Sequence, residues 1–115
     1  MNDKTLQRLR DARRHARLSL EALDRFGADL VTDVFASLAL ERSVEITGEA
    51  LRAIMEHDPE FVARAPGLPW KPAIRLRTRL AHGYSNIETD FLVETVRAEF
   101  PELLSQLDSL LEAFE

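Results

Sequence analysis

Apolar residues recur at helical spacing along nearly the whole chain, and this repeat restricts the possible fold more than any other feature. Leucine and phenylalanine positions three or four residues apart run through residues 3–26. A second series begins at Val34, Phe35 and Leu38 and continues toward residue 57. The strict alternation of polar and apolar residues that marks half-buried strands is nearly absent. The repeat therefore predicts an all-α protein.

Glycine and proline residues divide this repeat into separate helices. A first helix is expected from Asp3, its predicted N-cap, to a stop at Gly27. A second helix starts at Asp29 or Thr32 and ends before Asp58-Pro59, because the residue before a proline disfavours helical backbone. The first half of the chain is thus predicted to form two long helices.

The second half of the chain is interrupted more often. We expect a short helical turn over 59–64 and helices over 71–82, 88–99 and 101–114. Pro101 is placed at the start of the last helix, where its missing N–H is harmless. Trp70 is expected to anchor the start of the 71–82 helix in the core, the alternative being a platform that stacks on a base. Together the segments predict an up-down bundle of four to five helices.

Length and composition favour a single domain without a bound metal. A chain of 115 residues can bury one core, so we expect residues 1–115 to form one domain. The absence of cysteine excludes disulfides and thiolate ligands, and no histidine pair has metal-ligand spacing. We expect no cofactor. No signal peptide and no apolar run of ~18 residues is visible, so we expect a cytoplasmic protein.

The net charge of -5 conceals a strong separation of charge along the chain. Residues 71–84 carry four basic residues and no acidic one, whereas residues 85–115 carry eight acidic residues and one arginine. The acidic total argues against a protein that coats nucleic acid. The basic island can instead hold one or two phosphates or pair with acidic neighbours, and its arginines suit bidentate contacts.

Residues 77–84 bring three reactive side chains into one short segment, Arg-Thr-Arg-Leu-Ala-His-Gly-Tyr. The Arg77 guanidinium can neutralise a phosphate, and the His82 imidazole can transfer a proton near neutral pH. The pair suits cleavage of a phosphodiester without a metal. The alternative is an ordinary basic helix end that stops at Gly83, and spacing alone favours this alternative.

Arg77 is out of place on the predicted 71–82 helix. At ~100° per residue, Arg79 and His82 share a polar stripe, whereas Arg77 falls on the apolar side. A charge directed toward a core must be paired or must face a cleft. Glu45 and Glu49, one turn apart on the second helix, are candidate partners. Arg77 and His82 lie ~140° apart, so they converge only if the helix loosens before Gly83 or a symmetric dimer unites two copies.

Three segments occur in order along the chain: Glu45-Ile-Thr-Gly-Glu-Ala50, Pro66-Gly-Leu-Pro-Trp-Lys71, and Arg77 to Tyr84 followed by Phe100-Pro-Glu-Leu103. In this order they resemble the HepT-like toxins of the HEPN superfamily. The helical layout extends the resemblance over essentially the whole chain. It implies a homodimeric helical bundle and a metal-independent endoribonuclease site at the dimer cleft.

The resemblance also assigns roles to residues. It implies that Arg77 and His82 are the catalytic pair, and that Tyr84 accepts AMP from ATP. The enzyme that transfers the AMP would be a small nucleotidyltransferase, the antitoxin of a type VII-like toxin–antitoxin module. Thr78 stands where the family commonly has Asn. The supporting residues of the site would be Thr78, Arg79, Glu45 and Glu49.

An alternative function from another class is a catalytically silent helical module that only binds a nucleotidyltransferase or another partner. Arg77 and His82 discriminate between the two, because a silent module has no use for both side chains. Their joint presence favours the enzyme. A helical bundle built around a metal is a third possibility, but the chain lacks the Glu-x-x-His pairs that such bundles use.

Overall fold

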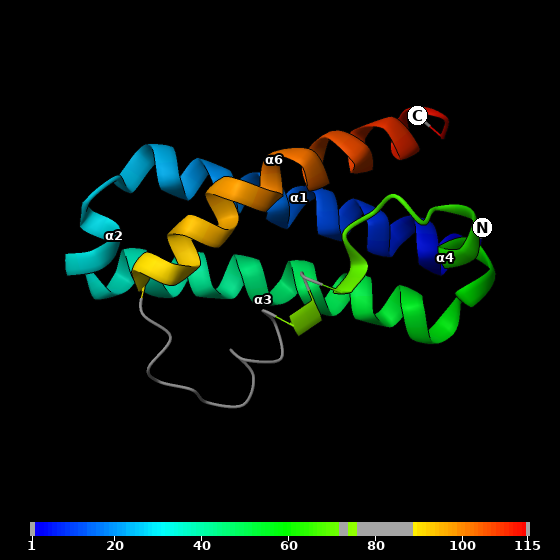
Figure 1. Cartoon of the computed structure of the whole chain (residues 1–115), viewed down its shortest axis with the longest axis horizontal. Coiled ribbons are helices and arrows are strands. Elements are labelled where there is room, and N and C mark those ends of the chain that lie inside the picture. The colour runs from blue at the N-terminus through cyan, green and yellow to red at the C-terminus, as the bar shows by residue number, and fades with distance from the viewer. Residues whose placement is uncertain (1, 72–73, 76–88, 115) are drawn as a thin grey trace.

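The computed structural model describes residues 2–71, 74–75 and 89–114, and over these ranges the chain is all-helical, without a strand (Figure 1). The helices are α1 (Asp3–Phe26), α2 (Asp29–Thr32), α3 (Val34–His57), α4 (Pro59–Arg64) and α6 (Thr89–Glu112). The predicted all-α class and the short turn over 59–64 are confirmed. Of the predicted 71–82 helix, Lys71, Ile74 and Arg75 are helical, and its other residues lie outside the described ranges.

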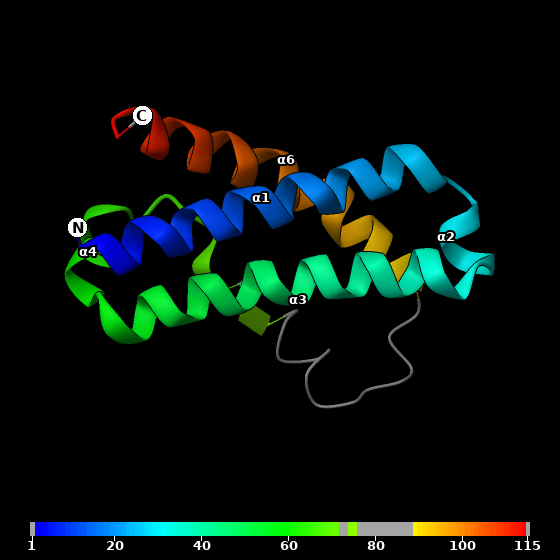
Figure 2. The ribbon, with the colours of Figure 1, turned by 180° about the vertical axis from the view of Figure 1, so that it is seen from behind.

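The long helices form a bundle in which α1 packs against both α3 and α6 (Figures 1 and 2). Its core includes Leu9 and Ala12 of α1, Leu40 of α3, and Val96 and Leu107 of α6, all of which are fully buried. Small residues on α1 allow the helices to approach closely, because Ala12 and Ala16 face the core. The described helices α3 and α6 touch each other far less than either touches α1. None of the described helices has the length and hydropathy that crossing a bilayer requires.

Both ends of α1 are fixed by local hydrogen bonds. The cap is Asn2 rather than the predicted Asp3, and its Oδ1 accepts a bond from the Thr5 amide at 2.7 Å. Asp3 is already helical and contributes a negative charge to the first turn, which favours the helix dipole. Gly27 ends the helix as predicted. Its positive φ of 49° lets its N–H reach the Leu23 carbonyl at 3.1 Å.

The predicted second helix is split in two at Asp33. The residue has extended backbone, with φ -100° and ψ 114°, between α2 and α3. Its Oδ1 accepts hydrogen bonds from the amides of Phe35 at 2.9 Å and Ala36 at 3.5 Å. Neither Asp29 nor Thr32 therefore starts the long helix. Asp33 does, because a carboxylate at the N-cap satisfies amides that have no partner within the helix.

The prediction of two C-terminal helices separated at Pro101 was wrong. Residues Thr89–Glu112 form the single helix α6 with Pro101 inside it, and the helix bends along its length (Figures 1 and 2). Proline removes one backbone hydrogen bond and disfavours a straight helix. The buried face nevertheless continues across the proline through Val96, Phe100, Leu103 and Leu107. Packing of this face outweighs the local cost of Pro101.

Candidate functional site

Two of the predicted site residues, Glu45 and Glu49, lie on the partly exposed side of α3 and already have cationic partners. Arg42 donates to Glu45 at 2.8 Å. Arg52 donates twice to Glu49, at 3.2 and 2.8 Å, and also binds Glu56. Each of the two carboxylates at i,i+4 is thus paired with an arginine of its own helix. Whether Arg77 adds a further pairing remains a prediction, because Arg77 lies outside the described residues.

Arg52, Glu49 and Glu56 form an exposed cluster of charges, the Arg52 cluster. The hydrogen bonds that Arg52 donates to Glu49 and Glu56, reinforced by the charges of these carboxylates, raise the pKa of the Arg52 guanidinium above its already high value. The side chains remain about half in solvent, so water and salt screen their attraction. The cluster holds the carboxylates in position and adds little stability.

Glu45 and Glu49 line a hollow between α1 and α3. The hollow has a volume of about 280 Å³ and contains charges of both signs. Arg8 and Asp11 of α1 face Arg42 and the two glutamates across it. Such a mixed lining can orient a cationic or polar side chain, which is the supporting role predicted for the glutamates. Among the described residues no group of three potential metal ligands occurs.

The segment that carries Arg77, Thr78, Arg79, His82 and Tyr84 lies in residues 76–88, outside the described ranges. Trp70 precedes this segment, and Thr89 follows it. Side-chain contacts hold both residues against the described helices.

Trp70 is an anchor in the core, as its sequence position predicted. The side chain is only 6% exposed, and its Nε1–H donates to the Ala65 carbonyl at 2.9 Å. The indole also meets the Phe61 ring edge to face, at 6.3 Å between centroids and 86° between planes. Burial leaves no ring face free to stack on a base. Trp70 therefore positions the chain that leads into the predicted catalytic segment.

At the other end of the segment, the Thr89 hydroxyl lies 3.3 Å from the Ser37 hydroxyl. The contact joins the first residue of α6 to the first turns of α3. On the Trp70 side, Lys71 and Met55 line one hollow, so Lys71 lies near the C-terminal half of α3. The residues that flank the predicted catalytic segment therefore lie near opposite ends of α3, the helix that carries Glu45 and Glu49.

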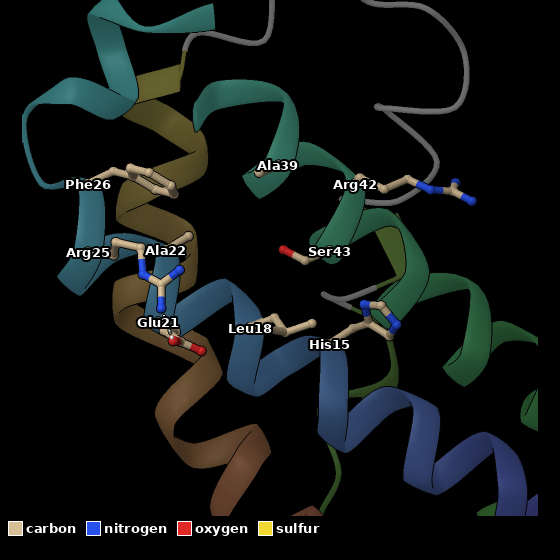
Figure 3. Close-up of a pocket in the computed structure, with 9 residues that line it drawn as sticks. All are labelled: His15, Leu18, Glu21, Ala22, Arg25, Phe26, Ala39, Arg42 and Ser43. Carbon is tan, nitrogen blue, oxygen red and sulfur yellow. Dashed lines mark hydrogen bonds and ion pairs between the residues drawn. The ribbon is translucent and has the colours of Figure 1, made fainter. Parts of the chain in front are cut away.

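Another hollow, of about 580 Å³, lies between the second half of α1 and the first half of α3 (Figure 3). Leu18, Ala22, Phe26 and Ala39 are among the residues that line it. Figure 3 shows Arg25 folded toward Glu21, with which it forms an ion pair of 2.8 Å. Its ionisable lining residues are His15, Glu21, Arg25 and Arg42, of which Glu21 and Arg25 neutralise each other.

His15 of α1 lines the same hollow. Its ring is partly buried, and its Nδ1 has no hydrogen-bond partner within the described part of the chain. Burial lowers the pKa of His15, and the charges of Arg14 and Arg42 lower it further against the opposing charge of Asp11. The imidazole is therefore neutral near pH 7. The spacing of apolar residues on α1 gave no signal of this hollow, because it depends on how α3 crosses α1.

Comparison with known proteins assigns the family. The protein family described as "Ribonuclease HepT-like" matches residues 6–110. This range is nearly the whole chain and includes residues 77–84. The chain belongs to the HepT-like ribonuclease family of the HEPN superfamily, as the sequence motifs indicated.

Individual relatives agree with this family. A Caldanaerobacter subterraneus subsp. tengcongensis protein named as an RNase is 33% identical over 73% of this chain and 72% of its own length. A Thermococcus cleftensis protein named as ribonuclease HepT is 30% identical over 71% of this chain and 72% of its own. A Methanocaldococcus jannaschii protein named as an RNase is 28% identical over 76% and 69%. No solved structure is significantly similar to the chain.

Proposed function

We propose that this protein is a metal-independent endoribonuclease that acts as the toxin of a type VII-like toxin–antitoxin module. In this proposal residues 1–115 form one cytoplasmic domain that works as a homodimer on RNA. The observation that carries the proposal is the segment from Arg77 to Tyr84 within a chain of the HepT-like ribonuclease family. The contacts of Trp70 with Ala65 and of Thr89 with Ser37 support it, since they fix the described chain before and after that segment.

The proposed reaction uses the RNA's own nucleophile. The ribose 2′-oxygen attacks phosphorus while a base removes its proton, and the bond to the 5′-oxygen breaks as an acid returns a proton to it. The products are a 2′,3′-cyclic phosphate end and a 5′-hydroxyl end. His82 and its dimer mate are the candidates for base and acid. Arg77 stabilises the negative charge that develops on the phosphorane oxygens.

Supporting residues hold this pair in place. Arg79 shares the polar stripe with His82 and contributes a second cation for the RNA backbone. Thr78 offers a hydroxyl where the family commonly has an amide. Glu45 and Glu49 already fix the cations Arg42 and Arg52 on α3, and the proposal has one of the glutamates also orient Arg77.

Regulation in this proposal acts on Tyr84. A cognate nucleotidyltransferase binds the toxin, and the Tyr84 oxygen attacks the α-phosphate of ATP, which releases pyrophosphate and leaves AMP on the phenol. The added phosphodiester places a negative charge two residues from His82, where an RNA phosphate must bind. The attached adenylate then excludes RNA, because an intramolecular ligand reaches an effective concentration in the millimolar range.

The decisive experiment is cleavage of an end-labelled RNA in the presence of EDTA. The wild-type protein should cut and leave 2′,3′-cyclic phosphate ends, whereas a substrate with 2′-deoxyribose at the cleavage position should stay intact. His82→Ala should abolish the cutting, and His57→Ala, which alters an exposed histidine at the end of α3, should not. Cutting that requires a divalent metal, or that persists in a folded His82→Ala protein, would refute the mechanism.

A further inference from the structure

Four large apolar side chains are exposed where α2 joins α3, and together they form the junction patch. Val31, Val34, Phe35 and Leu38 are 56%, 61%, 79% and 53% exposed. Isolated apolar residues are common on protein surfaces, whereas these four fall within eight consecutive positions. Apolar surface that is concentrated in this way marks an interaction site.

The patch residues of α3 lie on one side of the helix. At about 100° per residue, Val34, Phe35 and Leu38 fall within a sector of about 100°. The buried Ala36 and Leu40 lie on the opposite side, in the core. The outer side of the first turns of α3 is therefore the side against which a further helix can pack.

Acidic residues border the junction patch on α2 and α3. Residues 27–41 contain no basic residue and three acidic ones, Asp29, Asp33 and Glu41. The first basic residue after them is Arg42, and its guanidinium donates to Glu45 at 2.8 Å. The patch and its surroundings on these two helices therefore carry a surplus of negative charge.

The start of α6 adds to this surplus. The hydroxyls of Ser37 and Thr89 lie 3.3 Å apart, so the first residue of α6 lies beside the first turns of α3. Figures 1 and 2 show the two helix starts together at one end of the bundle. Residues 89–96 contain Asp90 and Glu94 and no basic residue. The apolar surface is thus bordered by carboxylates from two segments that are distant in the sequence.

The combination of apolar surface and negative charge determines which occupant suits the patch. The acidic border repels the phosphates of RNA or of a membrane surface. A two-fold pair of this chain at the patch would set the same acidic border against itself. The C-terminal half of α3 offers no compensating charge, because Glu49 and Glu56 there outnumber Arg52. A partner whose apolar side chains are flanked by cations satisfies both features of the patch.

We propose that the junction patch docks an amphipathic helix of a different protein. The apolar side of this helix covers Val31, Phe35 and Leu38 through residues spaced three or four positions apart, as in other cases of helix recognition. Lysine or arginine on its flanks meets Asp29 and Glu41 and fixes the position of the helix along the patch. The inference goes beyond the proposed function and holds whether or not the chain cleaves RNA.

Fluorescence anisotropy of a labelled peptide tests the proposal with the full chain. The probe is a synthetic helical peptide of roughly four turns, with leucine along one side and lysine on both flanks. It should bind the wild type, and Phe35→Ser should weaken the binding by about tenfold or more. Phe114→Ser is the matched control, because Phe114 is 50% exposed at the end of the chain and lies outside the patch. Far-UV circular dichroism verifies that both variants are folded.

Two altered peptides separate the apolar contribution from the contribution of charge. A peptide with serine in place of leucine should not bind, which excludes simple attraction between a cationic peptide and a chain of net charge -5. A peptide with glutamate in place of lysine should not bind either. Asp29→Asn combined with Glu41→Gln should weaken binding of the lysine peptide and reduce its dependence on ionic strength.

A wild-type chain that does not bind the lysine peptide, or equal binding to Phe35→Ser and Phe114→Ser, would overturn the proposal. Tight binding of the glutamate peptide would do the same. Sedimentation equilibrium without peptide gives the remaining outcome, because self-association that Phe35→Ser abolishes would mean that a second copy covers the patch. His82→Ala should bind the peptide like the wild type, so a failure of the nuclease proposal leaves this result unchanged.

Discussion

The Thr5 hydroxyl donates a hydrogen bond of 2.6 Å to the carboxylate of Asp58 and so joins the first turn of α1 to the end of α3. Thr5 is fully buried, and Asp58 also accepts a bond from the Phe61 amide at the start of α4. The Thr5 hydrogen bond is the main reason that the pKa of Asp58 lies below its ordinary value, although burial opposes the shift. The ionised carboxylate is therefore part of the native fold.

Thr5→Val should lower the melting temperature at pH 7, because it removes the donor and keeps the shape of the side chain. The folded-state pKa of Asp58 is depressed, so its contribution is present above the unfolded pKa of about 4 and is lost as pH falls through the folded value. The difference between wild type and variant should therefore shrink below about pH 4. Calorimetric scans from pH 7 to pH 2.5 measure it, and a difference that grows in acid would contradict the assignment.

Pro101→Ala should stabilise the protein. Pro101 is exposed and lies inside α6, where proline costs up to about 3 kcal/mol relative to alanine. The bend of α6 already accommodates the proline, so we expect a gain of about 1–2 kcal/mol rather than the full amount. Urea unfolding gives the value. A destabilised variant would mean that the bend is needed for the packing of Phe100 and Leu103.

The buried hydroxyls of Ser19 and Ser43 lie 2.7 Å apart. Each hydroxyl is also within hydrogen-bond distance of a backbone carbonyl of its own helix, that of His15 for Ser19 and that of Leu40 for Ser43. Ser43→Ala should therefore cost only about 1 kcal/mol, since Ser19 keeps its bond to the His15 carbonyl. Ser19→Ala combined with Ser43→Ala should cost less than the two single changes together. Ser105→Ala, on an exposed side of α6, is the control. Strict additivity in this double-mutant cycle would show that the pair contributes nothing.

Tyr84 should gain covalent AMP when the protein is produced together with its cognate nucleotidyltransferase, and the modified protein should no longer cleave RNA. Tyr84→Phe lacks the nucleophilic oxygen, so it should keep its mass and its toxicity. Intact-mass spectrometry and a growth assay measure the two effects. An unshifted wild-type mass, or an equal shift in Tyr84→Phe, would remove Tyr84 from the regulation.

Periodicity and stop residues predicted the helices that packing also favours. Gly27 and Asp58-Pro59 mark boundaries that the structure confirms, and Trp70 is buried as expected. The errors arose where the preference of a single residue competed with packing against distant parts of the chain. Pro101 locally favours a helix start, but a buried stripe on both of its sides keeps α6 continuous.

The site was less accessible to prediction than the fold. The motif from Arg77 to Tyr84 can be read from the sequence because its spacing is local and its family is recognisable. The pairing of Glu45 with Arg42 also follows local i,i+3 spacing. The hollow at His15 and the contact of Ser37 with Thr89 depend on distant segments that meet only in the folded chain. No spacing rule encodes such contacts.

The anchoring of Trp70 and Thr89 separates two demands on this chain. Residues that maintain the described core lie in the helices and in the loop before Trp70, whereas the residues proposed for chemistry lie between the two anchors. Trp70 and Thr89 themselves belong to the described bundle, so a change at either anchor alters the fold as well as the start or the end of the segment that carries the motif. Selection for activity therefore acts on these two residues through the stability of the protein.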